Sequence, residues 1–189
     1  MKQLFILLGL SILLSACGGY AIDSNISETV ADFEFTTQDN ETLNLDDLKG
    51  EWWIADFIFT NCTTVCLPMT ANMATLQTKL EDEGIDAKLV SFSVDPDFDS
   101  PEVLKAYGES YGANFDNWFF LTGYDFNTIK ELSVNSFRNL VEQPPEGSDQ
   151  VYHGTRFFLV SPEGEVVKYY GGIESSEIDL IVNDLKKVQ

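Results

Sequence analysis

The sequence predicts a single α/β domain in which helices cover a mainly parallel sheet. Segments typical of strands alternate with segments typical of helices over most of the chain, which favours parallel pairing. Trp52 to Phe59 is almost entirely apolar, as expected of a strand buried on both faces. Near the end of the chain, Pro162-Glu163-Gly164 separates two strand-like runs and predicts a hairpin that adds antiparallel strands at the edge. The 189 residues, 44% of them hydrophobic, suffice for one core.

The elements of the first half follow from periodicity and turn residues. Gln38-Asp39-Asn40 separates two short alternating runs and predicts a hairpin. After the central strand, apolar residues recur with a period of 3.6 from Pro68 until Gly84, which predicts an amphipathic helix. The expected elements are strands at Phe33 to Thr36, Thr42 to Leu45 and Trp52 to Phe59, a helix from Pro68 to Gly84, and a strand from Lys88 to Val94.

The second half continues the alternation and ends in a helix. The expected elements are a helix from about Pro101, a strand from Trp118 to Leu121, a helix from Asp125 to Phe137, a polar loop from Gln143 to Asp149, hairpin strands at Arg156 to Val160 and Glu165 to Tyr170, and a closing helix with Ile178, Ile181, Leu185 and Val188 on one face. This order is that of a thioredoxin-like fold with an N-terminal β-hairpin and an inserted strand and helix. Other α/β folds share this order of elements, so the choice of the thioredoxin-like fold among them rests on the cysteines described below.

The net charge, the length of the apolar runs and the number of cysteines each exclude a class of protein. Eleven Lys and Arg oppose 31 Asp and Glu, a net charge of −20, so nucleic acid is excluded as a main partner. No apolar run reaches the roughly 18 residues that span a bilayer, which excludes a multi-pass membrane protein. Three cysteines are too few for a disulfide scaffold.

The N-terminus predicts export and lipidation. Lys2, a short apolar stretch and the sequence Leu14-Ser15-Ala16-Cys17 have the layout of a lipoprotein signal peptide over residues 1–16. Cys17 would carry the lipid, residues 17–29 would form a tether, and residues 30–189 the domain. The location would be the extracytoplasmic face of a bacterial cell membrane. An ordinary secretory signal with a chance cysteine, or a buried N-terminal helix, are the other interpretations.

Cys62 and Cys66 form the first candidate site. They lie between the central strand and the following helix, where free backbone N–H groups and the helix dipole favour a thiolate. A spacing of four residues corresponds to about 6 Å along a helix, which permits a disulfide or two sulfurs pointing at one metal ion. A stabilising disulfide or two buried thiols is the competing interpretation, although so small a loop would add little stability.

His153 is the single histidine of the chain and the candidate third ligand. It follows a polar loop rich in Pro and Gly, in a region that approaches the cysteine loop in thioredoxin-like sheets. Two thiolates and an imidazole suit copper(I), and they hold copper(II) with a further ligand. Structural zinc normally takes four protein ligands. A lone histidine is otherwise usually structural or exposed.

Three segments together resemble the Sco (SenC/PrrC) family, most of all the lipid-anchored Sco proteins of Bacillus-type bacteria. They are Phe57-Ile58-Phe59-Thr60-Asn61-Cys62-Thr63-Thr64-Val65-Cys66, Ser93-Val94-Asp95-Pro96-Asp97-Phe98-Asp99-Ser100-Pro101, and His153 followed by Phe157-Phe158-Leu159-Val160. The resemblance implies a thioredoxin fold and one copper ion, Cu(I) or Cu(II), bound by Cys62, Cys66 and His153. It also implies a role in assembling the dinuclear copper centre of cytochrome c oxidase subunit II. Leu67 departs from the family, which usually has Pro there.

Two aspartates have weaker assignments. Asp95 ends a strand within the Asp-Pro motif, where it is a candidate partner of the site, or else a turn residue before Pro96. Asp56 lies in the central strand six residues before Cys62, a spacing that resembles the buried aspartate of thioredoxins. Here the preferred interpretation is that Asp56 faces a polar edge.

The leading hypothesis is therefore a copper chaperone, with thiol–disulfide oxidoreductase activity of Cys62 and Cys66 left open. Its expected partners are oxidase subunit II, thiol–disulfide reductants of the envelope and, through its lipid, the membrane. A general envelope oxidoreductase is the first alternative, but it has no need of His153. A thiol peroxidase would require an Arg near the thiol, and none precedes Arg138. A lipoprotein that only binds a partner has no need of the cysteine pair.

Overall fold

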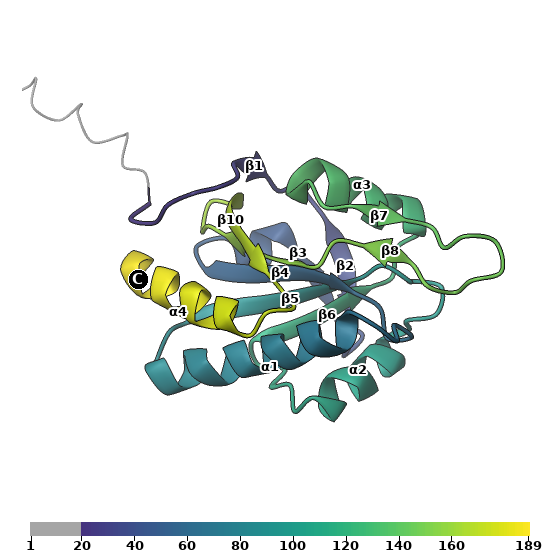
Figure 1. Ribbon diagram of the computed structural model, residues 1–189. Helices are drawn as coiled ribbons and strands as arrows, with labels where there is room; N and C mark the ends of the chain where they lie inside the picture. Colours follow the sequence, from purple (N-terminus) through teal and green to yellow (C-terminus); the bar gives the residue numbers. More distant parts are fainter. Residues whose placement is uncertain (1–19) are drawn as a thin grey trace, which may run out of the picture.

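The computed structural model describes residues 20–189, so the expected signal peptide and Cys17 lie outside the described residues. Figure 1 shows a central sheet with helices on both faces. The strands are β1 (Glu28–Thr29), β2 (Glu34–Thr37), β3 (Thr42–Asn44), β4 (Trp52–Ile58), β5 (Ala87–Ser93), β6 (Trp118–Thr122), β7 (Val141–Glu142), β8 (Tyr152–His153), β9 (Arg156–Val160) and β10 (Glu165–Gly171). The helices are α1 (Cys66–Glu83), α2 (Pro101–Ser110), α3 (Phe126–Phe137), α4 (Ser176–Val188) and the 3-10 helix η1 (Leu45–Leu48).

The main sheet has the strand order β1-β10-β9-β4-β5-β6-β2-β3. β4, β5 and β6 are parallel, while β9 and the edge strands pair antiparallel to their neighbours. The predicted parallel centre and the closing hairpin are therefore confirmed. β4 lies between β5 and β9, and all seven of its residues are buried, as its apolar sequence predicts.

The helices occupy the two faces of this sheet. α1 and α4 lie side by side on one face, where Lys186 pairs with Glu83, and α3 lies on the other face (Figure 1). Helix α1 begins at Cys66, two residues before the expected start at Pro68. Proline is tolerated there because the first N–H groups of a helix have no partner within it. Among residues 20–189, no helix has the length and apolarity to cross a membrane.

The structure also contains features that the sequence patterns did not predict. β7 and β8 form a small second sheet, with Val141 opposite His153, and the polar loop between them projects at the right of Figure 1. Residues 20–29, the described part of the expected tether, contact the domain through β1, which pairs with β10. The Tyr20 ring also lies edge-on to Trp52, with the two ring centroids 4.9 Å apart. Two-residue strands carry too little sequence pattern to be recognised.

Candidate metal centre

The two thiols and the imidazole meet at the end of β4. Cys62 lies in the loop after β4, Cys66 is the first residue of α1, and His153 ends β8. One ligand atom from each lies within 4.8 Å of the other two, and this is the one such group of three among residues 20–189. The predicted site residues Cys62, Cys66 and His153 are thus brought together, although 87 residues separate Cys66 from His153.

The loop places the Cys62 sulfur over the N-terminus of α1. The N-cap residue Val65 gives no side-chain cap, and the backbone N–H of Cys66 donates instead to Cys62 Sγ at 3.3 Å. The Thr64 hydroxyl lies 3.8 Å from the same sulfur. Cys62 is therefore outside the helix, and the expected spacing of one helical turn does not describe this pair. Its sulfur occupies the place of an N-cap oxygen, where a negative charge is stabilised.

The two cysteines have opposite acidities. A hydrogen bond from Cys66 lowers the pKa of Cys62, and the backbone N–H groups of Thr64 and Cys66 lower it further, against the effect of burial. The pKa of Cys66 is raised, because its thiol donates a hydrogen bond to Cys62 and because Cys66 is buried. Cys62 is 5% exposed and Cys66 is fully buried, and both are free thiols. Cys62 is therefore the more acidic of the two thiols, and Cys66 is the one that keeps its proton more strongly.

His153 is oriented so that one ring nitrogen faces the thiols. Nδ1 lies 3.0 Å from the carbonyl oxygen of Gly154, which can only accept, so Nδ1 carries the proton. Nε2 is left with its lone pair and lies 3.2 Å from Cys66 Sγ. A carbonyl that fixes the tautomer in this way is the usual support of a histidine that binds a metal.

Gly154 is required for that position of the histidine. A Cβ on Gly154 would lie 1.9 Å from Asn139 Oδ1, and the N–H of Gly154 donates to the carbonyl of Leu140. Asn139 follows the left-handed residue Arg138, which ends α3. The end of α3 and β7 therefore hold β8, and with it His153, against the cysteine loop.

A second set of contacts joins the histidine segment to the cysteine loop. Gln150 Nε2 donates to the carbonyl of Asn61 at 3.1 Å, and Gln150 Oε1 accepts from the N–H of Thr63 at 3.3 Å. Asn61 Nδ2 donates to Asp149 Oδ2 at 2.7 Å. These bonds lie on both sides of Cys62. Gln150 is not among the predicted site residues, since its one signal in the sequence is its place three residues before His153.

The two aspartates differ from each other in the structure. Asp95 is half-buried and does not belong to the group of mutually close metal ligands. Asp56 is fully buried opposite Ser91 of β5, and neither of its carboxylate oxygens has a hydrogen-bond partner. The expectation that Asp56 faces a polar edge is wrong, because β5 and β9 flank β4 on both sides. Burial raises the pKa of Asp56 to about 7.

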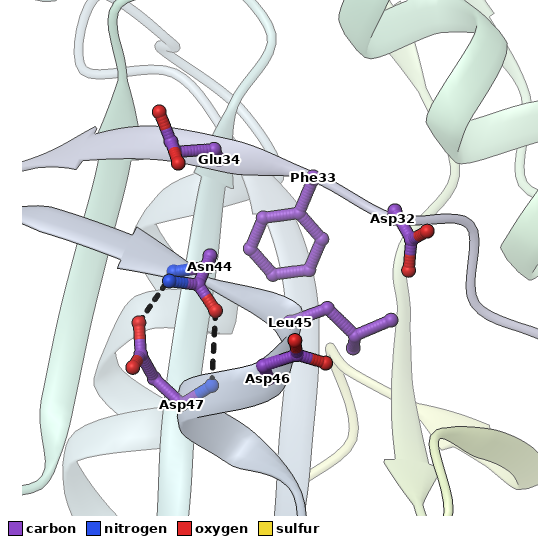
Figure 2. Close-up of a pocket in the computed structure, with 7 residues that line it drawn as sticks. All are labelled: Asp32, Phe33, Glu34, Asn44, Leu45, Asp46 and Asp47. Carbon is purple, nitrogen blue, oxygen red and sulfur yellow. Dashed lines mark hydrogen bonds between the residues drawn. The ribbon is translucent and has the colours of Figure 1, made fainter.

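Acidic side chains also surround a cavity of about 570 Å³ that is lined by residues preceding β4 in the chain (Figure 2). Asp32, Glu34, Asp46 and Asp47 lie around Phe33 and Leu45 there. Asn44 and Asp47 cap η1 reciprocally, each donating its backbone N–H to the side chain of the other. No cysteine or histidine lines this cavity.

Comparison with known proteins gives one consistent result. A family model described as SCO1/SenC matches residues 23–189. The SCO1 protein homolog of Bacillus subtilis is 49% identical over 175 residues, which cover 93% of this chain and 90% of the homolog. A SCO1/SenC family lipoprotein from Bacillus anthracis has a solved structure that matches with a TM-score of 0.82 at 44% identity, covering 87% of this chain and 98% of that one.

Two further solved structures add chemistry. BsSco, a member of the Sco family of cytochrome c oxidase assembly proteins with an identified disulfide switch, matches with a TM-score of 0.80 at 46% identity, covering 90% of this chain and 98% of its own. Copper-bound Sco1 of yeast matches with a TM-score of 0.71 at 27% identity, covering 84% and 89%. The predicted thioredoxin-like fold, which these proteins have, is confirmed. The family match over almost the whole domain, with 49% identity to a Bacillus relative, shows that this chain belongs to the SCO1/SenC family.

Proposed function

We propose that this protein binds copper and helps to assemble the dinuclear copper centre of cytochrome c oxidase subunit II. The observation that carries the proposal is the convergence of Cys62 Sγ, Cys66 Sγ and His153 Nε2 within 4.8 Å of one another. The copper in yeast Sco1 and the oxidase role of the family that includes BsSco support the choice of metal and partner.

The donor set suits copper in both oxidation states. Two soft sulfurs satisfy copper(I), and the imidazole nitrogen favours copper(II) when a further ligand is available. The protein's own part is to present a Cys62 thiolate, to hold the lone pair of Nε2 toward the sulfurs, and to release the proton of Cys66 when metal binds. Copper, when bound, supplies the cargo for the partner's centre.

The same two sulfurs support thiol–disulfide exchange. The Cys62 thiolate would attack a disulfide of the partner, and the departing sulfur would leave as a thiolate. Cys66 would then lose its proton and attack the Cys62 sulfur, which breaks the mixed disulfide and frees the partner dithiol. Two electrons pass to the partner and the Cys62–Cys66 disulfide forms. Envelope thiol reductants would have to restore the dithiol before copper could bind.

A general envelope oxidoreductase remains the second candidate, because the low pKa of Cys62 serves that chemistry equally well. His153 favours the copper function, since an oxidoreductase does not need an imidazole with its lone pair facing the thiols. A peroxidase is disfavoured, because Arg138 and Arg156 pair with Glu28 and Tyr169 respectively.

Copper titration of the reduced and the oxidised chain tests the proposal. Reduced protein should take up one copper per chain, and the disulfide form essentially none, because a disulfide sulfur has no thiolate charge to donate. Absorption spectra and intact mass would measure the uptake. Equal uptake by both forms would place the copper elsewhere on this acidic protein and would overturn the proposal.

We also propose that diacylated Cys17 anchors the protein on the extracytoplasmic face of the membrane, as the lipoprotein description of the Bacillus anthracis relative supports. A chain with a net charge of −20 gains nothing from anionic lipid, so attachment must depend on acyl chains. Cys17→Ala should move the protein from the membrane pellet to the soluble fraction. Retention in the pellet after a salt wash would contradict the anchor.

A further inference from the structure

A cleft of about 510 Å³ lies beside the candidate metal centre. One wall is the turn after β5, with Asp95, Asp97 and Phe98, and the other is the loop before β8, with Asp149 and Val151. None of these residues belongs to the group of metal ligands. The cleft is therefore a separate surface feature that needs its own explanation.

Both walls of the cleft are hydrogen-bonded to the segment just before Cys62. Asp99, which follows the first wall in the chain, is fully buried and accepts from the backbone N–H of Thr60 at 3.2 Å and from the Ser93 hydroxyl at 2.6 Å. Asp149 of the second wall accepts from Asn61 at 2.7 Å. A molecule bound in the cleft would therefore lie next to the loop that carries Cys62.

The cleft carries negative charge without a counter-charge. Asp95, Asp97 and Asp149 take part in none of the ion pairs formed by residues 20–189. No Lys or Arg lines the cleft. Burial raises the pKa of Asp95, and the neighbouring charges of Asp99, Asp97 and Asp149 raise it further. A cation placed between these carboxylates would be attracted by all of them.

The cleft also exposes apolar surface. Phe98 is 54% exposed although it is a large aromatic residue, and Phe126 and Val151 line the same space. Single exposed apolar residues are common, but an exposed aromatic ring that lines a cleft beside unpaired carboxylates is typical of a surface that a partner covers.

We propose that this cleft docks a segment of the partner protein that carries a Lys or Arg side chain next to an apolar side chain. This inference rests on the proposed function, which requires a partner to approach Cys62. The cation would lie between the carboxylates, and the apolar side chain would cover Phe98. A cleft of this size receives only a few side chains, which suits a short-lived complex that separates after transfer.

The test uses the full chain in dodecyl maltoside micelles, reduced and loaded with copper(I). One probe is a fluorescent peptide with the sequence Gly-Phe-Lys-Phe-Lys-Gly, and the other is the soluble copper-binding domain of oxidase subunit II. The variants are Asp97→Lys and Phe98→Ala. Their matched controls are Asp82→Lys on α1 and Leu180→Ala on α4, which are also exposed. Anisotropy gives the affinity for each probe.

Asp97→Lys should weaken binding of both probes about 10-fold at low salt, and the loss should shrink in 0.5 M salt because screening weakens the attraction. Phe98→Ala should weaken binding about 5- to 10-fold, with little dependence on salt. The control variants should bind within about 2-fold of the wild type. Copper uptake should be unchanged in all four variants, since none of these residues is a metal ligand.

The outcomes separate this inference from the proposed function. If the subunit II domain binds and receives copper, but both cleft variants bind it as tightly as wild type, the cleft inference is wrong and the proposed function stands. If the peptide binds and the cleft variants lose it, while the subunit II domain neither binds nor receives copper, the cleft is supported and the proposed partner is wrong. If Asp97→Lys abolishes binding of Ca²⁺ but not of the peptide, the cleft is a cation site and the inference is overturned.

Discussion

The two ends of β4 make an instructive comparison, because both carry acidic side chains around a cavity. Residues that precede Trp52 in the sequence line the cavity of Figure 2, with Asp46 and Asp47 from η1 and Asp32 and Glu34 from the region of β2. Beyond Ile58, the chain reaches Cys62 and the acidic cleft beside it. By charge alone the two ends resemble each other.

They differ in what their polar groups already do. In the first region, Asp46 pairs with Lys49, and Asp47 caps η1, so local partners satisfy these carboxylates. In the second, two sulfurs and a ring nitrogen from segments far apart in sequence point at one another. Residues joined over such a distance lose more chain entropy, so their convergence needs the support that Gln150 and Gly154 provide. The comparison teaches that converging soft ligands, and not acidity, distinguish a copper site.

The largest expected effect is the loss of a sulfur. Removing a residue that only supports a metal ligand typically weakens metal binding roughly 10- to 100-fold. Cys66→Ser removes a ligand itself, so it should weaken copper(I) binding by more than that. The double variant Asp46→Asn/Asp47→Asn should leave copper(I) affinity unchanged. Competition titration with a copper(I) chelator measures both. Comparable losses in the two proteins would remove the distinction between the two ends of β4.

His153→Ala should separate the two copper states. Both sulfurs remain, so copper(I) should still bind, while copper(II), which prefers nitrogen and higher coordination, should weaken by at least about 10- to 100-fold. Separate titrations of the two states measure this, and reduction of a test disulfide by the variant is the control for an intact dithiol. Unchanged copper(II) affinity would make His153 structural and favour the oxidoreductase.

Asp56 in the middle of β4 should make stability depend on pH. Its pKa is about 7 in the folded protein, against an ordinary value of 3.8. As pH rises from about 4 to 7, the unfolded chain loses this proton before the folded chain does, so the wild type loses stability that it does not regain above pH 7. Asp56→Asn should therefore unfold at a higher urea concentration at pH 8, a gain of about 2–4 kcal/mol.

That gain should vanish below about pH 3, where the carboxyl is protonated in both states. The comparison is best made on copper-free, reduced protein. Asp46→Asn, at an exposed position of η1, is the control. A gain of equal size at both pH values would mean that the effect of Asp56→Asn does not come from ionisation.

The smallest effect belongs to the cap of η1. Asn44→Ala removes the side-chain oxygen that accepts the N–H of Asp47, and should cost about 1 kcal/mol of unfolding free energy. Copper affinity should not change, because neither Asn44 nor Asp47 belongs to the group of metal ligands. Urea unfolding and a copper titration of the same preparation test both statements. A copper affinity that fell with the stability would show that the two ends are coupled.

The sequence by itself determined most of the architecture. Apolar runs and 3.6-residue periodicity located the long strands and helices, because their burial depends on local pattern. The position of Cys62 and Cys66 before an amphipathic helix also indicated the thiol chemistry, since every helix N-terminus has free N–H groups. His153 stood out as the single histidine, on a segment expected to approach the cysteines.

Only the tertiary structure decided how these groups meet. The Nδ1 proton of His153 depends on the carbonyl of Gly154, and the approach of β8 depends on Gln150 and on the space that Gly154 leaves for Asn139. The isolation of Asp56 depends on the strands on either side of β4. Each of these is a contact between residues distant along the chain. Hydrogen bonds and burial of that kind follow from the packing of whole elements, which no local pattern encodes.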